Sequence, residues 1–177
     1  MIKNTKKHIS FTYGIIILLL FAFYTYGIMS AFTIKAYEPM PNEERVSDEA
    51  NLFTDEEEFL LLNRITELQD KTKMGFAIVT INYNNKSSME YADDYFDYNN
   101  VALDENYDGA LLLIDMDNGD LWISTTGNMI VYLTDDRIDY ILDEIIGYAY
   151  TEDFYMCADI FIDCLEVYYD EGIPSNQ

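Results

Sequence analysis

Apolar residues recur through the middle of the chain at the spacing of amphipathic helices, in two segments that each begin with a capping signal. One segment follows Thr54 and extends to about Gly75, and the other follows Ser87 and extends to about Tyr98. Thr54 and Ser87 each precede a Glu by three residues, and this capping box satisfies backbone N–H groups at a helix N-terminus. We therefore predict two capped helices, the first of them ending at Gly75.

Three shorter apolar runs have the pattern of β-strands. Residues 76–81, FAIVTI, are rich in β-branched and aromatic side chains and lie between Gly and Asn. Residues 110–114 are apolar without interruption, which predicts a strand buried on both faces. Residues 121–125 alternate, so Leu121 and Ile123 should face one side of the sheet, opposite to the side chains between them.

Two more helices are expected toward the C-terminus. Thr134 stands as an N-cap ahead of one apolar stripe, and residues 152–169 carry apolar side chains at i, i+3, i+4 and i+7. The resulting order is helix, strand, helix, strand, strand, helix, helix, which is typical of an α/β protein. We predict an α/β/α sandwich whose mixed sheet contains one β-hairpin.

The N-terminal segment has a different pattern. Residues 9–34 contain no charged residue, and this is long enough to cross a bilayer, which needs roughly 20 apolar residues. Three lysines precede the segment and place the N-terminus in the cytoplasm by the positive-inside rule. The same features also fit a cleaved secretory signal, with small residues near Ala31 or Ala36. In both cases the remainder of the chain is exported.

These patterns divide the chain into five parts: a basic cytoplasmic N-terminus (1–8), a transmembrane anchor or signal segment (9–34), a linker (35–45), a folded domain (46–172) and a tail (173–177). We expect a single-pass protein of the cell membrane, held in the lipid by its N-terminal helix, with the domain on the extracytoplasmic side. The alternative is secretion after cleavage of the signal.

The charge of the chain is strongly negative and unevenly placed. The formal net charge is −23, but four lysines and no acidic residue precede Tyr37. The rest of the chain holds six Lys and Arg against 33 Asp and Glu, a formal charge of −27. Such a surface repels nucleic acid and anionic lipid, and it attracts cations and basic partner proteins. The alternative explanation of this charge is that it keeps the domain soluble.

The stretch LLLIDMDNGDLWIS, residues 111–124, has three competing interpretations. In the first, Asp115 and Asp117 follow a buried strand as the nucleophile and general acid of an aspartyl-phosphate phosphatase, a chemistry that needs a cation on the phosphate. The last lysine, Lys86, precedes these acids and the only later cation is Arg137, which argues against this chemistry. In the second, the acids begin an EF-hand, but Thr126 stands where the bidentate Glu is required.

The third interpretation is a β-hairpin. Asn118-Gly119 lies between two β-patterned runs, and both residues tolerate the positive φ that a type I′ turn requires. We predict such a turn, with Asp115 and Asp117 as mostly solvated residues at its tip.

Five segments in order resemble the TPM domain family: VSDEANLFTDEE, MGFAIVTI, YDGALLLIDMDNGDLWISTTG, YLTDDRIDYILDEI and EDFYMCADIFIDCL. This resemblance spans Val46 to about Gly172. It implies a Rossmann-like fold, and a location outside the cytoplasmic membrane or in the thylakoid lumen, tethered by one membrane segment. Some members are described as acid phosphatases, some bind calcium, and others act in photosystem repair or receptor modulation.

Matching the family pattern residue by residue implies a candidate site. Asp48, Asp108 and Asp135 match its acidic positions, and convergent carboxylates would suit a hard cation, so Ca²⁺ is the candidate cofactor. The accompanying ligand-binding candidates are Gly109, Gly127, Thr134 and Arg137. The family's G-x-G is half present, because Met129 replaces its second glycine. The alternative is structural: the three acids would brace a loop, start a turn and favour a helix N-terminus.

The function expected from these features is that of a membrane-tethered, extracytoplasmic interaction or scaffold module with a membrane or envelope protein as partner. The only histidine, His8, lies outside the domain, and no catalytic residue is assigned. The alternative function is a metal-assisted acid phosphatase of low activity, in which Arg137 would bind phosphate.

Overall fold

The structure is a computed structural model, and it describes residues 36–175 of the chain. The segment for which we predict a membrane helix, residues 9–34, lies outside the described residues. Within 36–175, none of the helices combines the length and apolar character needed to cross a membrane. The described residues from Tyr37 onward form one compact unit.

Four strands and five α-helices, with one short 3-10 helix, make up the described part of the chain. In chain order they are η1 (Asn42–Glu44), β1 (Val46–Asp48), α2 (Asp55–Thr72), β2 (Gly75–Ile81), α3 (Ser88–Tyr98), β3 (Gly109–Asp115), β4 (Asp120–Thr126), α4 (Met129–Tyr132), α5 (Asp135–Tyr150) and α6 (Phe154–Glu171).

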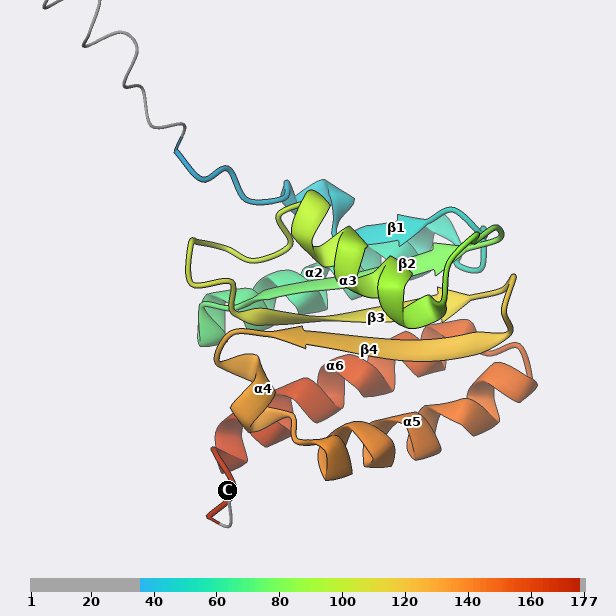
Figure 1. The fold of residues 1–177 in the computed structure, drawn as a ribbon. Helices are drawn as coiled ribbons and strands as arrows, with labels where there is room; N and C mark the ends of the chain where they lie inside the picture. The colour runs from blue at the N-terminus through green and yellow to red at the C-terminus, as the bar shows by residue number, and fades with distance from the viewer. Residues whose placement is uncertain (1–35, 176–177) are drawn as a thin grey trace, which may run out of the picture. The chain divides into compact units, whose positions relative to one another are not determined.

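The strands form one mixed sheet in the order β1-β2-β3-β4. β1, β2 and β3 are parallel, and β4 pairs antiparallel with β3 as the second strand of a hairpin. Figure 1 shows the parallel strands running in one direction and β4 returning beside β3. The prediction of an α/β fold with a mixed sheet and one hairpin is confirmed.

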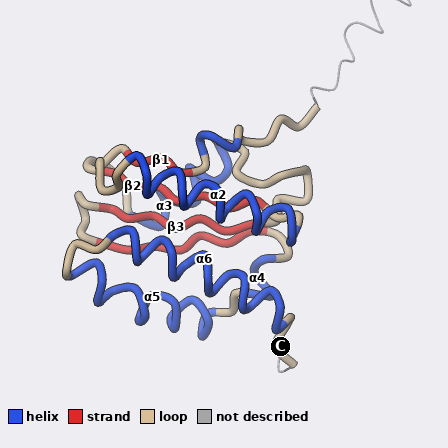
Figure 2. Tube along the Cα trace, turned by 180° about the vertical axis from the view of Figure 1, so that it is seen from behind, coloured by secondary structure: helices blue, strands red, loops and turns tan. Residues whose placement is uncertain are grey.

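Helices cover both faces of this sheet. α3 lies on the face seen in Figure 1, whereas α2 and α6 lie behind the sheet and come to the front in Figure 2. α5 lies beside α6 and contributes Ile141 and Ile145 to the same core. Alternate residues of β2 serve the two layers: Phe76 and Ile78 belong to the core under α2, α5 and α6, and Ala77 and Val79 belong to the core under α3. Every residue of β2 and β3 is buried, as predicted for β3.

The helix starts follow the predicted caps, but the end of α2 does not. Thr54 and Ser87 both form complete capping boxes, and Thr134 caps α5. α2 ends at Thr72, with Lys73 in the left-handed conformation at φ 62°, so the prediction that Gly75 ends this helix is wrong. Gly75 instead begins β2, where a Cβ atom would lie 2.0 Å from the carbonyl oxygen of Val101.

The hairpin between β3 and β4 has a longer turn than the sequence predicts. Asp115 pairs with Asp120, so residues 116–119 form a four-residue loop. Gly119 has φ 66°, but Asn118 is not among the residues with positive φ, which excludes a type I′ turn. The turn prediction is therefore wrong in type although the hairpin itself is confirmed. Hydrogen bonds from the loop N–H groups of Asp117 and Asn118 to the carboxylate of Asp115 explain the wider turn.

A buried arginine joins the short strand β1 to the rest of the sheet. Arg45 precedes β1 and its side chain is 0% exposed. Its guanidinium donates hydrogen bonds to the backbone oxygens of Phe76 (3.2 Å), Val101 (2.8 Å) and Met40 (3.0 Å). Burial lowers the pKa of Arg45 to about 10, an effect that nearby Tyr37 partly opposes. The sequence pattern indicates neither this buried charge nor the three-residue strand that it supports.

Candidate functional site

Polar side chains lie at the carboxyl ends of the parallel strands, the edge of the sheet where α/β proteins usually bind ligands. Asp48 ends β1 and Asp115 ends β3, with Thr80 near the end of β2. Asp48 pairs with Thr80 of β2, and Asp115 pairs with the next residue of β2, Ile81. The two aspartates are therefore offset by one residue along the sheet. Because successive side chains of a strand point to opposite faces, Asp48 and Asp115 point to opposite faces of the sheet.

Asp115 faces the α3 layer and is 1% exposed, which contradicts the prediction of a solvated turn residue. Its Oδ2 accepts hydrogen bonds from Asn84 Nδ2 (2.9 Å), Ser88 Oγ (2.9 Å) and Asn118 Nδ2 (2.8 Å). Its Oδ1 accepts from the N–H groups of Asp117 and Asn118, both at 3.1 Å. Both carboxylate oxygens are thus engaged with donors of the same chain.

The pKa of Asp115 reflects this environment. Burial would raise it, but the hydrogen bonds from Asn84, Asn118 and Ser88 outweigh burial and hold the pKa below its ordinary value. The side chain is therefore an anion at neutral pH. It holds together the β3–β4 loop, the segment after β2 and the start of α3.

Asp48 points to the opposite face of the sheet from Asp115, and its carboxylate oxygens also accept hydrogen bonds from the chain. Its Oδ1 accepts from the N–H of Leu52 (3.0 Å) and its Oδ2 from the N–H of Phe53 (2.8 Å). Thr80 Oγ1 donates a further hydrogen bond to the same carboxylate. These contacts fix the loop between β1 and α2, which is the bracing role that we considered as an alternative to metal binding.

The other candidates lie toward the amino ends of the parallel strands, away from Asp48 and Asp115. Asp108 directly precedes β3 and accepts hydrogen bonds from the backbone N–H (2.7 Å) and Nδ2 (2.9 Å) of Asn128. A Cβ atom on Gly127, which has φ 58°, would lie 2.1 Å from Asp108 Oδ1. A Cβ atom on Gly109 would lie 2.0 Å from the carbonyl oxygen of Gly75. The glycines thus permit close packing around Asp108.

Thr134 and Asp135 form the N-terminus of α5. Thr134 Oγ1 accepts from the N–H of Arg137 at 3.4 Å, and Asp135 is the first helical residue, where a negative charge favours the helix. Both residues line a cavity of about 320 Å³ beside Thr125, which pairs with Ala110 near the start of β3.

Arg137 is engaged within the protein. Its guanidinium donates to the carbonyl oxygens of Tyr132 (2.8 Å) and Gly172 (3.0 Å) and forms an ion pair with Glu171 at 2.8 Å. The guanidinium carbon also lies 4.4 Å from the centre of the Tyr168 ring. These contacts tie the start of α5 to the end of α6, so the geometry does not present Arg137 as a free phosphate ligand.

The three predicted metal ligands do not converge. Asp48 pairs with Thr80, whereas Asp108 precedes the residue that pairs with Gly75. Thr80 and Gly75 are five positions apart in β2, about 16 Å along a strand, and Asp108 lies one position further out. Asp135 lies toward the Asp108 edge. Across residues 36–175, no three His, Cys, Asp or Glu side chains are grouped as they would be to hold a metal ion.

Sequence reasoning missed the donors that surround Asp115. Asn84, Ser88 and Asn118 come from three separate segments, and only the fold brings them to one carboxylate. A usable signal was present, because a helix that starts at Ser88 beside a parallel strand directs its first turn to the carboxyl edge of the sheet.

A family model described as the TPM domain matches residues 46–168. Two solved structures have the same fold: the N-terminal domain of a protein from P. gingivalis and the BA42 protein from the psychrophilic bacterium Bizionia argentinensis. The first has a TM-score of 0.59 at 20% identity and covers 77% of this chain and 92% of its own. The second has a TM-score of 0.60 at 17% identity and covers 71% and 86%. A comparison with curated proteins found no match.

Proposed function

Because the chain belongs to the TPM domain family, we propose that it is a membrane-tethered, extracytoplasmic interaction module that binds a basic partner protein of the membrane or envelope. One observation carries the proposal. The two carboxylates at the ligand-binding edge of the sheet, Asp48 and Asp115, point to opposite faces and accept hydrogen bonds from the chain itself. A nucleophile or general base needs a carboxylate oxygen that is free to contact a substrate, whereas these two carboxylates are engaged with donors of their own chain.

The distribution of positive charge supports the same proposal. Among the described residues, five of the six Lys and Arg side chains are engaged: Arg45 is buried against carbonyl groups, and Arg64, Lys71, Lys86 and Arg137 form ion pairs with Asp or Glu. A phosphatase needs a cation to neutralise the phosphoryl group in the transition state. The large surplus of carboxylates is instead complementary to a basic protein surface.

The tether is part of the proposal because residues 9–34 are uncharged and three lysines precede them. Crosslinking on intact cells tests location and interaction together. With the full-length chain as bait, a membrane-impermeant amine-reactive reagent should crosslink the domain to its partner. In a parallel sample without the reagent, high salt should release the same partner from the bait.

The control bait is the chain truncated after residue 45, which keeps the N-terminal segment and lacks the domain. The proposal is contradicted when both baits retain the same proteins, or when only a membrane-permeant reagent labels the full chain. Parallel samples in Ca²⁺ and in EGTA test whether Ca²⁺ serves as a cofactor of the interaction. Equal yields in the two samples would exclude that role.

A further inference from the structure

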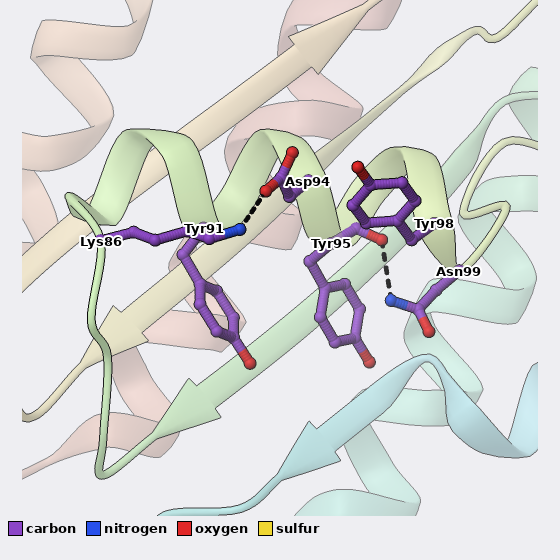
Figure 3. Close-up of a pocket in the computed structure, with 6 residues that line it drawn as sticks. All are labelled: Lys86, Tyr91, Asp94, Tyr95, Tyr98 and Asn99. Atoms are coloured by element: carbon purple, nitrogen blue, oxygen red, sulfur yellow. Dashed lines mark hydrogen bonds and ion pairs between the residues drawn. The ribbon is translucent and has the colours of Figure 1, made fainter.

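A groove lined by tyrosines lies on α3, away from the carboxylates described above. This tyrosine groove has a volume of about 200 Å³ and is lined by Lys86, Tyr91, Asp94, Tyr95, Tyr98 and Asn99. Figure 3 shows the rings of Tyr91 and Tyr95 extending from α3 in the same direction, toward the β1 side of the sheet, while Lys86 reaches along the helix to Asp94.

The two central rings are held in place by their surroundings. Tyr91 and Tyr95 are one helical turn apart and stack with centroids separated by 6.3 Å at an interplanar angle of 24°. Both pack against the core under α3, and the Tyr95 hydroxyl lies near Ser47 of β1. Tyr98, one turn further, is 79% exposed. The groove therefore presents a fixed aromatic surface with one additional ring at its end.

The charge around these rings is negative on both sides. Asp94 lies in the groove itself, and Glu44 and Glu49 lie on the β1 side. Burial, and then the charges of Glu49 and Glu44, raise the pKa of Tyr95. Burial, and then the charge of Glu49, likewise raise the pKa of Tyr91. An aromatic face with neighbouring carboxylates is a binding environment for an organic cation.

A cation of the protein already occupies this environment. Lys86 Nζ forms an ion pair with Asp94, and both side chains remain solvent-accessible, at 44% and 41%. An exposed pair of this kind contributes little to stability, so a stronger ligand can displace the lysine from the carboxylate. Lys86 thus marks the position of a positive charge without closing the groove.

We propose that the tyrosine groove binds an arginine side chain from a basic segment of the partner protein. The planar guanidinium stacks on the tyrosine surface and takes the place of Lys86 as the hydrogen-bond donor to Asp94. Arginine suits the site better than lysine because a guanidinium can stack on a ring and donate two parallel hydrogen bonds to one carboxylate. This inference rests on the proposed interaction function and names the chemistry of its partner.

Charge complementarity selects this occupant over others. A second copy of the chain would bring a further domain of formal charge −27 to the same surface, and nucleic acid or anionic lipid would add negative charge as well. A basic protein segment is attracted by the whole domain and finds in the groove a place where one of its cations is desolvated beside an aromatic ring.

The test uses the full-length chain in zwitterionic micelles and a capped Gly-Arg-Gly-Arg-Gly peptide as the probe, with affinity measured by calorimetry. Asp94→Asn should weaken binding about fivefold or more, and Tyr98→Ala, which removes an exposed ring, should weaken it by a similar factor. Lys86→Met should tighten binding, because it removes the competing cation. The lysine version of the peptide should bind more weakly than the arginine version.

Matched charge changes on the other face of the domain control for general attraction. Lys71 forms ion pairs with Glu166 and Asp170 between α2 and α6, so Lys71→Met and Asp170→Asn change the net charge by the same amounts as the groove variants. The proposal predicts little change in either control. Equal effects of Asp94→Asn and Asp170→Asn would reject the groove while leaving the interaction function standing. Absence of peptide binding by the unaltered chain would also reject the groove, whereas hydrolytic turnover would reject the interaction function.

Discussion

Replacing Arg45 with Met is expected to destabilise the domain by about 4 kcal/mol, the largest effect of any single substitution that we propose. Met retains an unbranched stem like that of Arg, but it lacks the guanidinium and donates no hydrogen bond. The substitution leaves the carbonyl oxygens of Met40, Phe76 and Val101 facing an apolar side chain in a fully buried site. The corresponding drop in the thermal midpoint is about 15 °C for a domain of this size.

Thermal unfolding followed by circular dichroism measures this effect. Lys71→Met is the matched control, because Lys71 is also positively charged but forms only exposed ion pairs, and its midpoint should stay close to that of the unaltered chain. Arg45→Lys should recover little of the loss, since one ammonium group cannot reach the carbonyls that the guanidinium spans. Midpoints of Arg45→Met and Lys71→Met that agree would show that the buried arginine is not what secures β1.

Asp115→Asn is expected to cost about 3 kcal/mol of unfolding free energy, although the two side chains have nearly the same shape. An amide group at Oδ2 would face the donor groups of Asn84, Ser88 and Asn118. The hydroxyl of Ser88 can rotate to accept, but the two amides cannot turn without loss. Asn84 Oδ1 accepts from the N–H of Lys86, and Asn118 Nδ2 also donates to the carbonyl oxygen of Lys86.

The dependence of this cost on pH follows from the lowered pKa of Asp115. A carboxyl group whose pKa is lower in the folded state than in the unfolded state stabilises the protein above the unfolded value, which is 3.8 for Asp115. That contribution is lost as the pH falls below 3.8 and through the still lower folded value. Urea unfolding should therefore show a difference between the unaltered chain and Asp115→Asn that is constant near neutral pH and shrinks below about pH 4.

The control for this series is Asp120→Asn. Asp120 is directly opposite Asp115 in the hairpin but is exposed, so its substitution should leave the unfolding free energy close to that of the unaltered chain at every pH. A difference between Asp115→Asn and the unaltered chain that persists unchanged to pH 2 would contradict the assignment of the cost to the carboxylate anion.

Local signals in the sequence were enough to predict most of the fold. Thr54 and Ser87 fix two helix starts because a cap and its Glu lie within three residues of each other. The uninterrupted apolar run of β3 and the alternation in β4 follow from which faces are buried, and the hairpin follows from the short connection between the two strands. Each of these features depends on neighbours in the chain.

The remaining features depend on contacts between distant segments. β1 has only three residues, too few for a periodic pattern, and it is held in place by pairing with β2 and by Arg45. The carboxylate of Asp115 is buried because donors arrive from the segment after β2 and from α3, which no pattern around residue 115 reveals.

The candidate site shows the same limit. Asp48, Asp108 and Asp135 match acidic positions of the family, but the sequence does not give the register that separates Asp48 from Asp108 along β2. Tyr91 and Tyr95 are four residues apart, but this spacing alone does not indicate a groove. The groove depends on the fold, which places Ser47 and Glu49 near the two ring hydroxyls.

The central claim is that the polar edge of this sheet is structural and that the domain binds rather than catalyses. Hydrolysis of p-nitrophenyl phosphate by the full-length chain tests it most directly, measured from pH 4 to 8 with Ca²⁺, with Mg²⁺ and with EDTA. We expect rates equal to the protein-free blank under every condition. Saturable turnover that Asp48→Asn or Asp115→Asn abolishes, in variants shown by circular dichroism to be folded, would contradict it.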